Sequence, residues 1–409
     1  MKSAKINDLI SEKITGEWGS EVSDNNGVNV LRTTNFTNRG VVNYSSVVRR
    51  QIGASLIAKK RLLPGDIIIE KSGGGPKQPV GRVVYFDLNV DEPYLCNNFT
   101  SVLRPNSLKV DSKYLFYSLF YKHITDVTLR YQNKTTGIIN LKLERYLEDE
   151  LIPLPPLPAQ QKIASILEKA DAARQKRAET LKLTEQFLQS AFLDMFGDPE
   201  ENPNNFPFIE LEKLCSIIVD CPHSTPIKAN RITNFPCIRT SELTRGYISW
   251  DSMQYLEETE YKKRTLRLIP EKGDIVYGRE GTYGEAVVIP SNYKFSLGQR
   301  TMLFRPDFKK TNSIYLWAIV RSDFVYRQAK KKNRSSTVGH VNVKDIKQFR
   351  ILNPPLPIQQ KFANLVEKVE KLREKQRQSE AELELLFQSL MQRAFNGELV
   401  REEVEQSAS

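Results

Sequence analysis

Cys215, Cys221 and His223 lie close enough in the sequence to suggest a zinc site, because thiolate and imidazole groups are common zinc ligands. Their spacing matches no common structural zinc pattern, and the four cysteines of the chain include no CxxC pair. Buried or loop thiols in a reducing compartment are the simpler interpretation. We therefore expect no metal on this chain and a cytoplasmic location.

The segment Asn353-Pro354-Pro355 matches the core of an amino-methyltransferase catalytic motif. That motif requires an aromatic side chain at the next position to stack on the flipped base, and Leu356 stands there. The glycine run 73–75 is not followed by the Gly-Lys-Ser or Gly-Lys-Thr of a nucleotide-binding loop. With three histidines in the chain, no histidine-based triad has a good candidate. The sequence predicts no catalytic residues and no cofactor.

Basic and polar residues gather in glycine-rich loops, where a backbone can approach a phosphate closely. We expect Lys and Arg side chains of these loops to contact phosphates and Gln78 and Gln299 to read base edges, with Arg82 and Arg300 suited to either role. The ordinary alternative for any one of them is a solvated surface charge. The DNA-binding candidates are Lys71, Lys77, Gln78, Arg82, Lys134, Arg279, Tyr283, Gln299, Arg300, Lys332 and Arg334.

The net charge of +11 and the pI near 9.3 favour a polyanionic partner. Residues 160–197 and 359–397 each carry about +1, and the tail 398–409 carries about −3. The remaining segments therefore carry the basic excess. No stretch approaches the roughly 20 consecutive apolar residues of a membrane helix, and the N-terminus lacks an apolar signal segment.

The chain contains an internal repeat. The string PPLPAQQKI at 155–163 returns as PPLPIQQKF at 354–362, and the next segment repeats at the same offset without an insertion. Weaker matches, such as Gly65-Asp66-Ile67 with Gly273-Asp274-Ile275, place the preceding globular parts in register. The globular parts differ in length, whereas the segments after the prolines do not.

Each repeated segment predicts one long helix, because neither proline nor glycine occurs between Pro158 and Gly197 or between Pro357 and Gly397. A helix of about 37 residues would be roughly 55 Å long. Apolar residues at three- and four-residue spacing predict that the two helices pack along their lengths. The packing candidates are Ile163, Ile166, Leu167, Ala170, Phe362, Leu365, Val366 and Val369.

Two arrangements satisfy this pattern. One is a coiled-coil homodimer. The other is an antiparallel pair within one chain, which the duplication favours because two equivalent helices can cover each other. In the globular parts, strands near 66–70, 82–86, 274–277 and 286–289, with helices near 114–121 and 314–329, predict small curved sheets of an α+β fold.

The repeat, the two PPLPxQQK entries, the Phe196-Gly197-Asp198 end and the FNGEL end at 395–399 resemble the specificity subunit of type I restriction-modification systems. The resemblance covers essentially the whole chain. It implies an architecture of two target-recognition domains separated by an antiparallel coiled coil, with a pseudo-twofold internal repeat. The implied divisions are 1–158 and 198–352 for the recognition domains, 159–197 for the first spacer helix, 353–397 for the proline-led second helix, and 398–409 for a polar tail.

The resemblance also implies a function without catalysis. Each globular domain would read one half of a bipartite double-stranded DNA target, and the helix pair would set the spacing and dock two methyltransferase subunits. Restriction subunits would join them. S-adenosylmethionine, ATP and Mg would belong to those partner subunits. A nuclease or methyltransferase with its own tandem reading domains would need a catalytic domain for which this chain has no room, and a structural coiled-coil adaptor would leave the basic globular parts unexplained.

Overall fold

The computed structural model describes residues 2–22, 27–75, 78–135, 138–281, 283–290, 293–332 and 339–399. The chain forms two compact units. The first contains Met1–Ala178 and Gln378–Ser409, and the second contains Glu179–Arg377. Each unit thus combines one globular part with one section of each long helix. The boundaries of the two units therefore fall within the long helices and not at their ends.

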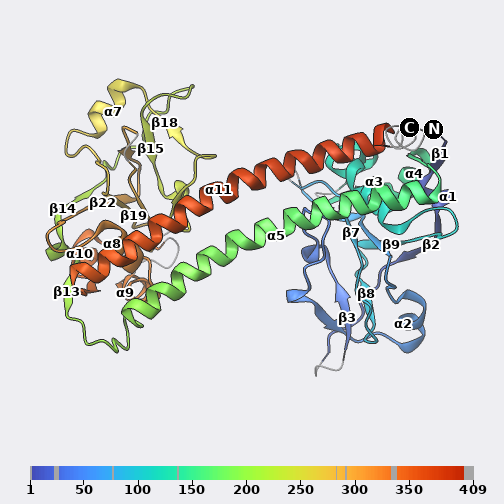
Figure 1. Ribbon diagram of the computed structural model, residues 1–409, viewed down its shortest axis with the longest axis horizontal. Coiled ribbons are helices and arrows are strands. Elements are labelled where there is room, and N and C mark those ends of the chain that lie inside the picture. Colours follow the sequence, from blue (N-terminus) through green and yellow to red (C-terminus); the bar gives the residue numbers. More distant parts are fainter. Residues whose placement is uncertain are drawn as a thin grey trace, which may run out of the picture. The chain divides into compact units, whose positions relative to one another are not determined.

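The two long helices are α5 (Leu157–Phe196) and α11 (Leu356–Phe395), each of 40 residues, drawn in green and red in Figure 1. In the first unit the beginning of α5 lies beside the end of α11, where Arg174 bonds to Glu384 and covers the ring of Phe387. In the second unit the end of α5 meets the beginning of α11 through Phe192 and Phe362. The two helices therefore run in opposite directions within each unit.

A glutamine in the first turn of each long helix, Gln160 or Gln359, makes the same two hydrogen bonds in both copies of the repeat. The Gln160 side chain donates to the Pro155 carbonyl at 2.8 Å and accepts from the backbone N–H of Asp111 at 2.9 Å. Gln359 makes the same two bonds, to the Pro354 carbonyl at 2.7 Å and from the N–H of Asn312 at 2.9 Å. Both amides are buried, so these bonds offset their loss of hydration and fix each helix start to its globular part.

The two globular parts share one sheet topology, although their sequences match only weakly. Both contain a four-stranded sheet in which the equivalent strands follow in the same order. Both also contain a separate two-stranded sheet and a separate three-stranded sheet. In the first part these sheets are β2 (Ile10–Thr15), β9 (Thr100–Pro105), β5 (Ile67–Glu70) and β7 (Val83–Tyr85); β1 (Ser3–Lys5) and β12 (Leu151–Pro153); and β4 (Val48–Arg50), β3 (Val28–Leu31) and β8 (Tyr94–Cys96). In the second they are β14 (Cys215–Asp220), β22 (Thr301–Pro306), β19 (Ile275–Gly278) and β20 (Ala286–Val288); β13 (Phe208–Glu210) and β23 (Arg350–Leu352); and β18 (Gln254–Tyr255), β15 (Pro236–Ile238) and β21 (Ser296–Leu297).

Two further small sheets differ between the parts. The first part has β10 (Gln132–Thr135), β11 (Ile138–Leu141) and β6 (Ser72–Gly74), and the second has the hairpin of β16 (Leu243–Thr244) and β17 (Tyr247–Ile248). The shorter helices are α1 (Ile6–Leu9), α2 (Ala54–Lys60), α3 (Ser112–Ile124), α4 (Leu143–Asp149), α6 (Leu211–Leu214), α7 (Glu258–Arg264), α8 (Ser313–Val320), α9 (Asp323–Lys332) and α10 (Val343–Lys347). The mixed helices and small sheets confirm the α+β prediction.

The helical stretch predicted over 314–329 is divided into two helices in the structure. α8 ends at Val320, and the Ser322 hydroxyl accepts from the N–H of Val325 in the first turn of α9. A serine that caps a new helix competes with continuation of the old one, and the apolar pattern alone does not reveal this break.

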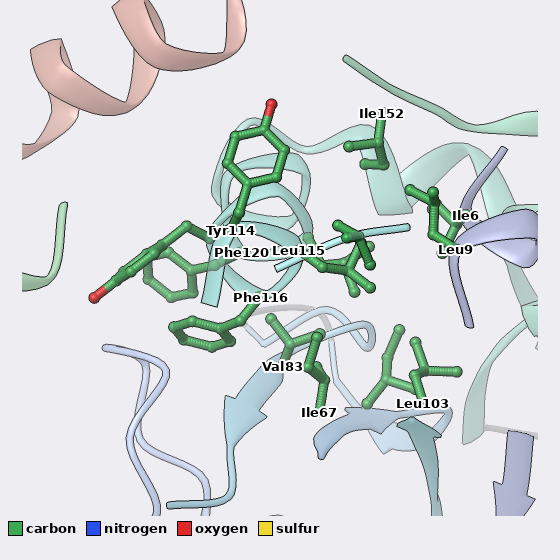
Figure 2. Packing of buried hydrophobic residues seen from close by; sticks show 14 of the residues in the cluster. Ile6, Leu9, Ile67, Val83, Leu103, Tyr114, Leu115, Phe116, Phe120 and Ile152 are labelled. Carbon is green, nitrogen blue, oxygen red and sulfur yellow. The ribbon is translucent and has the colours of Figure 1, made fainter. Parts of the chain in front are cut away.

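The core of the first unit lies between its four-stranded sheet and α3. Figure 2 shows Phe116 of α3 beside Val83 and Ile67 of the sheet, and Tyr114 and Phe120 belong to the same buried cluster. The buried cluster also takes in the predicted helix residues Ile163 and Leu167, together with residues near the end of α11. The long helices therefore bury their apolar faces against the globular part as well as toward each other.

The second unit repeats this arrangement, with Phe362, Val366 and Val369 in its buried cluster and Leu365 at the edge. Ile166, the repeat equivalent of Leu365, is half-buried in the first unit, and Ala170, the equivalent of Val369, lies at the edge of the first cluster. None of the helices in the described part of the chain combines the length and the apolar character that a membrane span requires.

Candidate nucleic-acid interface

In each four-stranded sheet one inner strand, β5 or β19, is followed directly by a basic residue that joins the same two neighbouring segments. In the first domain the N–H of Lys71 donates to the Phe99 carbonyl at 2.9 Å, and its carbonyl accepts from the N–H of Leu141 at 2.8 Å. In the second domain Arg279 bonds in the same way to Arg300 and Val341, at 3.0 and 3.1 Å. Lys71 and Arg279 are therefore equivalent positions.

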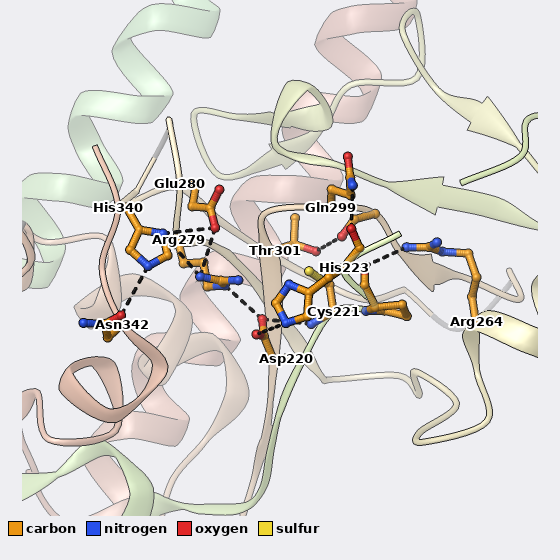
Figure 3. Close-up of polar contacts among 12 residues, drawn as sticks. Asp220, Cys221, His223, Arg264, Arg279, Glu280, Gln299, Thr301, His340 and Asn342 are labelled. Atoms are coloured by element: carbon orange, nitrogen blue, oxygen red, sulfur yellow. Dashed lines mark hydrogen bonds and ion pairs between the residues drawn. The ribbon is translucent and has the colours of Figure 1, made fainter. Parts of the chain in front are cut away.

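The Arg279 side chain holds two carboxylates in place. Its Nε donates to Oδ1 of Asp220 at 2.9 Å, and its Nη1 lies 3.0 Å from Oε1 of Glu280. The same Glu280 oxygen lies 3.0 Å from Nδ1 of His340. Figure 3 shows these four side chains together. The guanidinium is only 5% exposed, whereas His340 is 37% exposed, so the arginine positions groups that reach the surface.

An open pocket of ≈ 570 Å³ lies beside this cluster. Gln299 donates to the His223 carbonyl at 2.7 Å and so ties the loop before β22 to the segment after β14. The His223 imidazole is 72% exposed. The residues that border the pocket include Asp220, His223, Arg279, His340, Asn342 and Lys344.

The first domain has a different set of side chains around Lys71. The Ser72 hydroxyl bonds to Oδ1 of Asn140 at 2.6 Å, and Phe99 exposes 43% of its surface. Burial lowers the pKa of the Lys71 ammonium, which is half-buried. The described residues at this position offer an amide, a hydroxyl, an amine and an aromatic ring, in contrast to the carboxylates of the second domain.

Arg82 does not lie where a phosphate contact would need it. Its guanidinium, 9% exposed, makes a bidentate ion pair with Glu70 at 2.8 and 3.0 Å and also donates to the carbonyls of Phe36 and Thr33. The expected DNA contact of Arg82 is therefore corrected to a role inside the domain. The Arg279 guanidinium is buried in the same way and pairs with Asp220 and Glu280.

Several other candidates do lie at the surface. Arg300 is 56% exposed, at a backbone φ of +68°, and Lys332 is 54% exposed with its Nζ 3.7 Å from Asp345. Gln78 is exposed and lies 3.4 Å from the Asn38 amide oxygen. Tyr283 stacks on Tyr326, with 5.4 Å between ring centroids. Lys134 lies in β10, and its side chain is not described. Lys77 and Arg334 lie outside the described residues.

Sequence reasoning missed Glu280, His340 and Asn140, because it searched for positive charge and for glutamine. No pattern in the sequence marks these residues. The structure shows that Asn140 and His340 are equivalent, because Asn140 pairs with Ser72 in the first domain as His340 pairs with Glu280 in the second. The one signal that could have located the position is the register of the two Gly-Asp-Ile strands, which aligns Lys71-Ser72 with Arg279-Glu280.

Among the residues with described positions, no group of three or more His, Cys, Asp or Glu side chains is arranged to hold a metal ion. Cys221 and Cys237 are buried, and burial raises the pKa of the Cys215 thiol to about 12. Cys221 belongs to a buried hydrophobic cluster, and Cys215 packs at the edge of another.

Comparison with known proteins agrees with the internal repeat. The family model described as type I restriction modification DNA specificity domain matches twice, at residues 2–184 and 205–385. The chain is 23% identical to the type I restriction enzyme MjaVIII specificity subunit of Methanocaldococcus jannaschii, over 71% of each chain. It is 22% identical to the EcoBI specificity subunit of Escherichia coli, over 89% of this chain and 84% of that one.

The fold also resembles a solved structure, the type I restriction-modification S subunit from M. genitalium. The TM-score is 0.57 at 14% identity, with 96% of both chains covered. The two family matches cover most of the sequence and coincide with the two globular parts and most of each long helix. The chain therefore belongs to the type I restriction-modification DNA specificity family, as a DNA target-recognition subunit and not a catalytic one.

Proposed function

We propose that the chain reads a bipartite DNA target, with one half-site contacted by each globular domain. The observation that carries this proposal is that two domains of the same topology present different side chains at equivalent backbone positions, Lys71-Ser72 in one and Arg279-Glu280 in the other. Two copies of one fold that carry different side chains at the DNA-reading position suit a target whose two halves differ in sequence. Exposed cations such as Arg300 and Lys332 set the register on the phosphates.

The helix pair is proposed to form an antiparallel coiled coil that separates the two half-sites. Support comes from the opposite directions of α5 and α11 and from their equal length of 40 residues. At 1.5 Å per residue each helix is about 60 Å long. This corresponds to somewhat under two turns of DNA at about 34 Å per turn and is an upper limit for the separation of half-site centres.

The same helices are proposed to dock two methyltransferase subunits, and restriction subunits through them. Phe187 of α5 and Leu386 of α11 occupy equivalent positions of the repeat, and each is 50% exposed. Large apolar side chains exposed at matching places on two helices are suited to two copies of one partner. In this proposal S-adenosylmethionine, ATP and Mg are bound by those partners and not by this chain.

The phosphate contacts are tested by the salt dependence of DNA binding. For the complex with its methyltransferase partner, replacing Arg300 and Lys332 together by glutamine is expected to lower the slope of log K against log salt concentration by about 1.8, since each lost phosphate contact removes about 0.9. Binding is measured by mobility shift at several salt concentrations on a duplex that the wild-type complex methylates.

The matched control replaces Arg231 and Lys262 by glutamine. Both are more than 70% exposed in the same domain but form closer ion pairs, with Glu257 at 3.0 Å and Glu258 at 2.8 Å, than Arg300 and Lys332 do at 3.6 and 3.7 Å. The charge change is equal, and the slope is expected to stay near its original value. An unchanged slope in the Arg300 and Lys332 variant would refute the phosphate assignment. A wild-type complex that does not bind DNA would refute DNA recognition and favour a purely structural adaptor.

A further inference from the structure

The two recognition domains place unlike residue pairs at one equivalent position beside the end of the inner strand, β5 or β19. In the first domain Ser72 pairs with Asn140, and in the second domain Glu280 pairs with His340. The flanking backbone bonds through Lys71 and Arg279 are the same in both. A position that determines specificity needs a backbone that stays the same while its polar side chains differ from one domain to the other.

The second-domain pair places the carboxylate of Glu280 between two arginines, Arg279 and Arg300. A carboxylate repels phosphate, so Glu280 does not serve the general attraction to DNA. Nor does it only neutralise the buried Arg279, since Asp220 already accepts from that guanidinium at 2.9 Å. The Glu280 side chain stays 23% exposed, and its second oxygen lies 3.6 Å from Nε of Arg300, itself exposed.

The contacts of Glu280 fix its orientation. Arg279 and His340 both lie 3.0 Å from Oε1, while Oε2 is held only loosely on the Arg300 side. An ionised carboxylate accepts hydrogen bonds and cannot donate them. In the major groove both cytosine N4 and adenine N6 carry amino donors, but adenine also presents the acceptor N7 beside N6, which repels a carboxylate. An acidic side chain therefore pairs with N4 of cytosine.

We propose that Glu280, positioned by Arg279 and His340, reads the N4 amino group of a cytosine in the half-site bound by the second domain. The equivalent Ser72–Asn140 pair offers both a donor and an acceptor, so the first domain selects a different base at the corresponding place. This inference rests on the proposed bipartite recognition and adds the residue and the base chemistry for one position of one half-site.

The test uses the chain assembled with its methyltransferase partner and the target identified by mapping methylated adenines. In Glu280→Gln one acceptor oxygen becomes an amino donor, which faces the cytosine amino group unfavourably. The expected result is a loss of about 5- to 150-fold in the preference for cytosine at one position of the second half-site, with a gain for adenine, the base that glutamine recognises. The first half-site is expected to stay unchanged.

Glu258→Gln is the matched control, because it removes the same charge from an exposed pair in α7, and it is expected to keep the wild-type motif. Preferences are measured by competition binding on duplexes that vary one base at a time. A Glu280→Gln complex with the melting temperature of the control and an unaltered motif overturns the inference, and so does one that loses several positions at once.

His340→Asn introduces the residue found at the first-domain position and keeps the inference testable if Glu280→Gln fails to fold. Because His340 positions Glu280, this variant is expected to weaken the same single base preference. An intact preference in His340→Asn overturns the inference. Failure of the proposed function has a different signature, since the wild-type complex would then show no half-site that depends on the second domain.

Discussion

Replacing Arg82 by alanine is expected to lower the free energy of unfolding of the first domain by about 3–5 kcal/mol, because the substitution leaves a buried carboxylate without its partner. Glu70 is 2% exposed and receives both hydrogen bonds of the bidentate pair from Arg82. The carbonyls of Phe36 and Thr33 lose a donor as well. The measurement is denaturant unfolding of the full chain, with hydrogen exchange of the β5 amides to locate the effect.

Arg49→Ala is the control, since Arg49 pairs with Glu92 at the surface and its loss is expected to cost at most about 1 kcal/mol. The double variant Glu70→Met with Arg82→Met removes both charges and is expected to recover much of the lost stability. An Arg82→Ala variant as stable as Arg49→Ala would show that Arg82 is not needed inside the domain, and would restore it as a candidate for DNA contact.

Replacing Phe196 by alanine is expected to destabilise the second unit by about 3–5 kcal/mol through the cavity it leaves. Phe196 ends α5, is fully buried, and has its ring centroid 4.8 Å from that of Tyr315 and 5.5 Å from that of Phe362. These contacts join the end of α5 to α8 and to the start of α11. The melting temperature of the full chain and exchange of the α8 amides report the loss.

Leu193→Ala serves as the comparison, because Leu193 lies on the same helical turn and is 51% exposed. Its substitution is expected to change stability by only about 0.5 kcal/mol. If Phe196→Ala and Leu193→Ala lowered the melting temperature equally, the end of α5 would not be packed into the second unit.

The sequence revealed the long helices well, because their signals are local. The proline entry, the absence of glycine and proline, and the apolar spacing all act within one turn or two, and the observed bounds Leu157–Phe196 and Leu356–Phe395 lie within about two residues of the expected ones. The glutamine is found at the same place in both copies of the repeated sequence. Its role in fixing each helix start to the helix cap at Asp111 or Asn312 was not visible in the sequence, since those partners lie in another part of the chain.

The candidate site was harder to predict, because burial and partners decide what an arginine does. Arg82 and Arg300 are both basic loop residues in the sequence, yet one is buried against Glu70 and the other is exposed. Arg279 meets Asp220 from 59 residues away, a contact that composition and spacing do not reveal. Nothing in the sequence distinguishes the carboxylate of Glu280 from the other acidic side chains of the chain.

Replacing Asn202–Leu352 with the corresponding segment of another specificity subunit tests the division of labour between the two domains. The segment contains β13 and β23, which pair with each other and close the second domain. The chimera and the wild-type chain are each co-expressed with the methyltransferase partner, and methylated adenines are mapped by sequencing. The wild-type map is predicted to show two short specific sequences separated by a fixed gap of unspecified bases, with only one of them changed in the chimera. A continuous motif, or a chimera in which both halves change, would contradict this account.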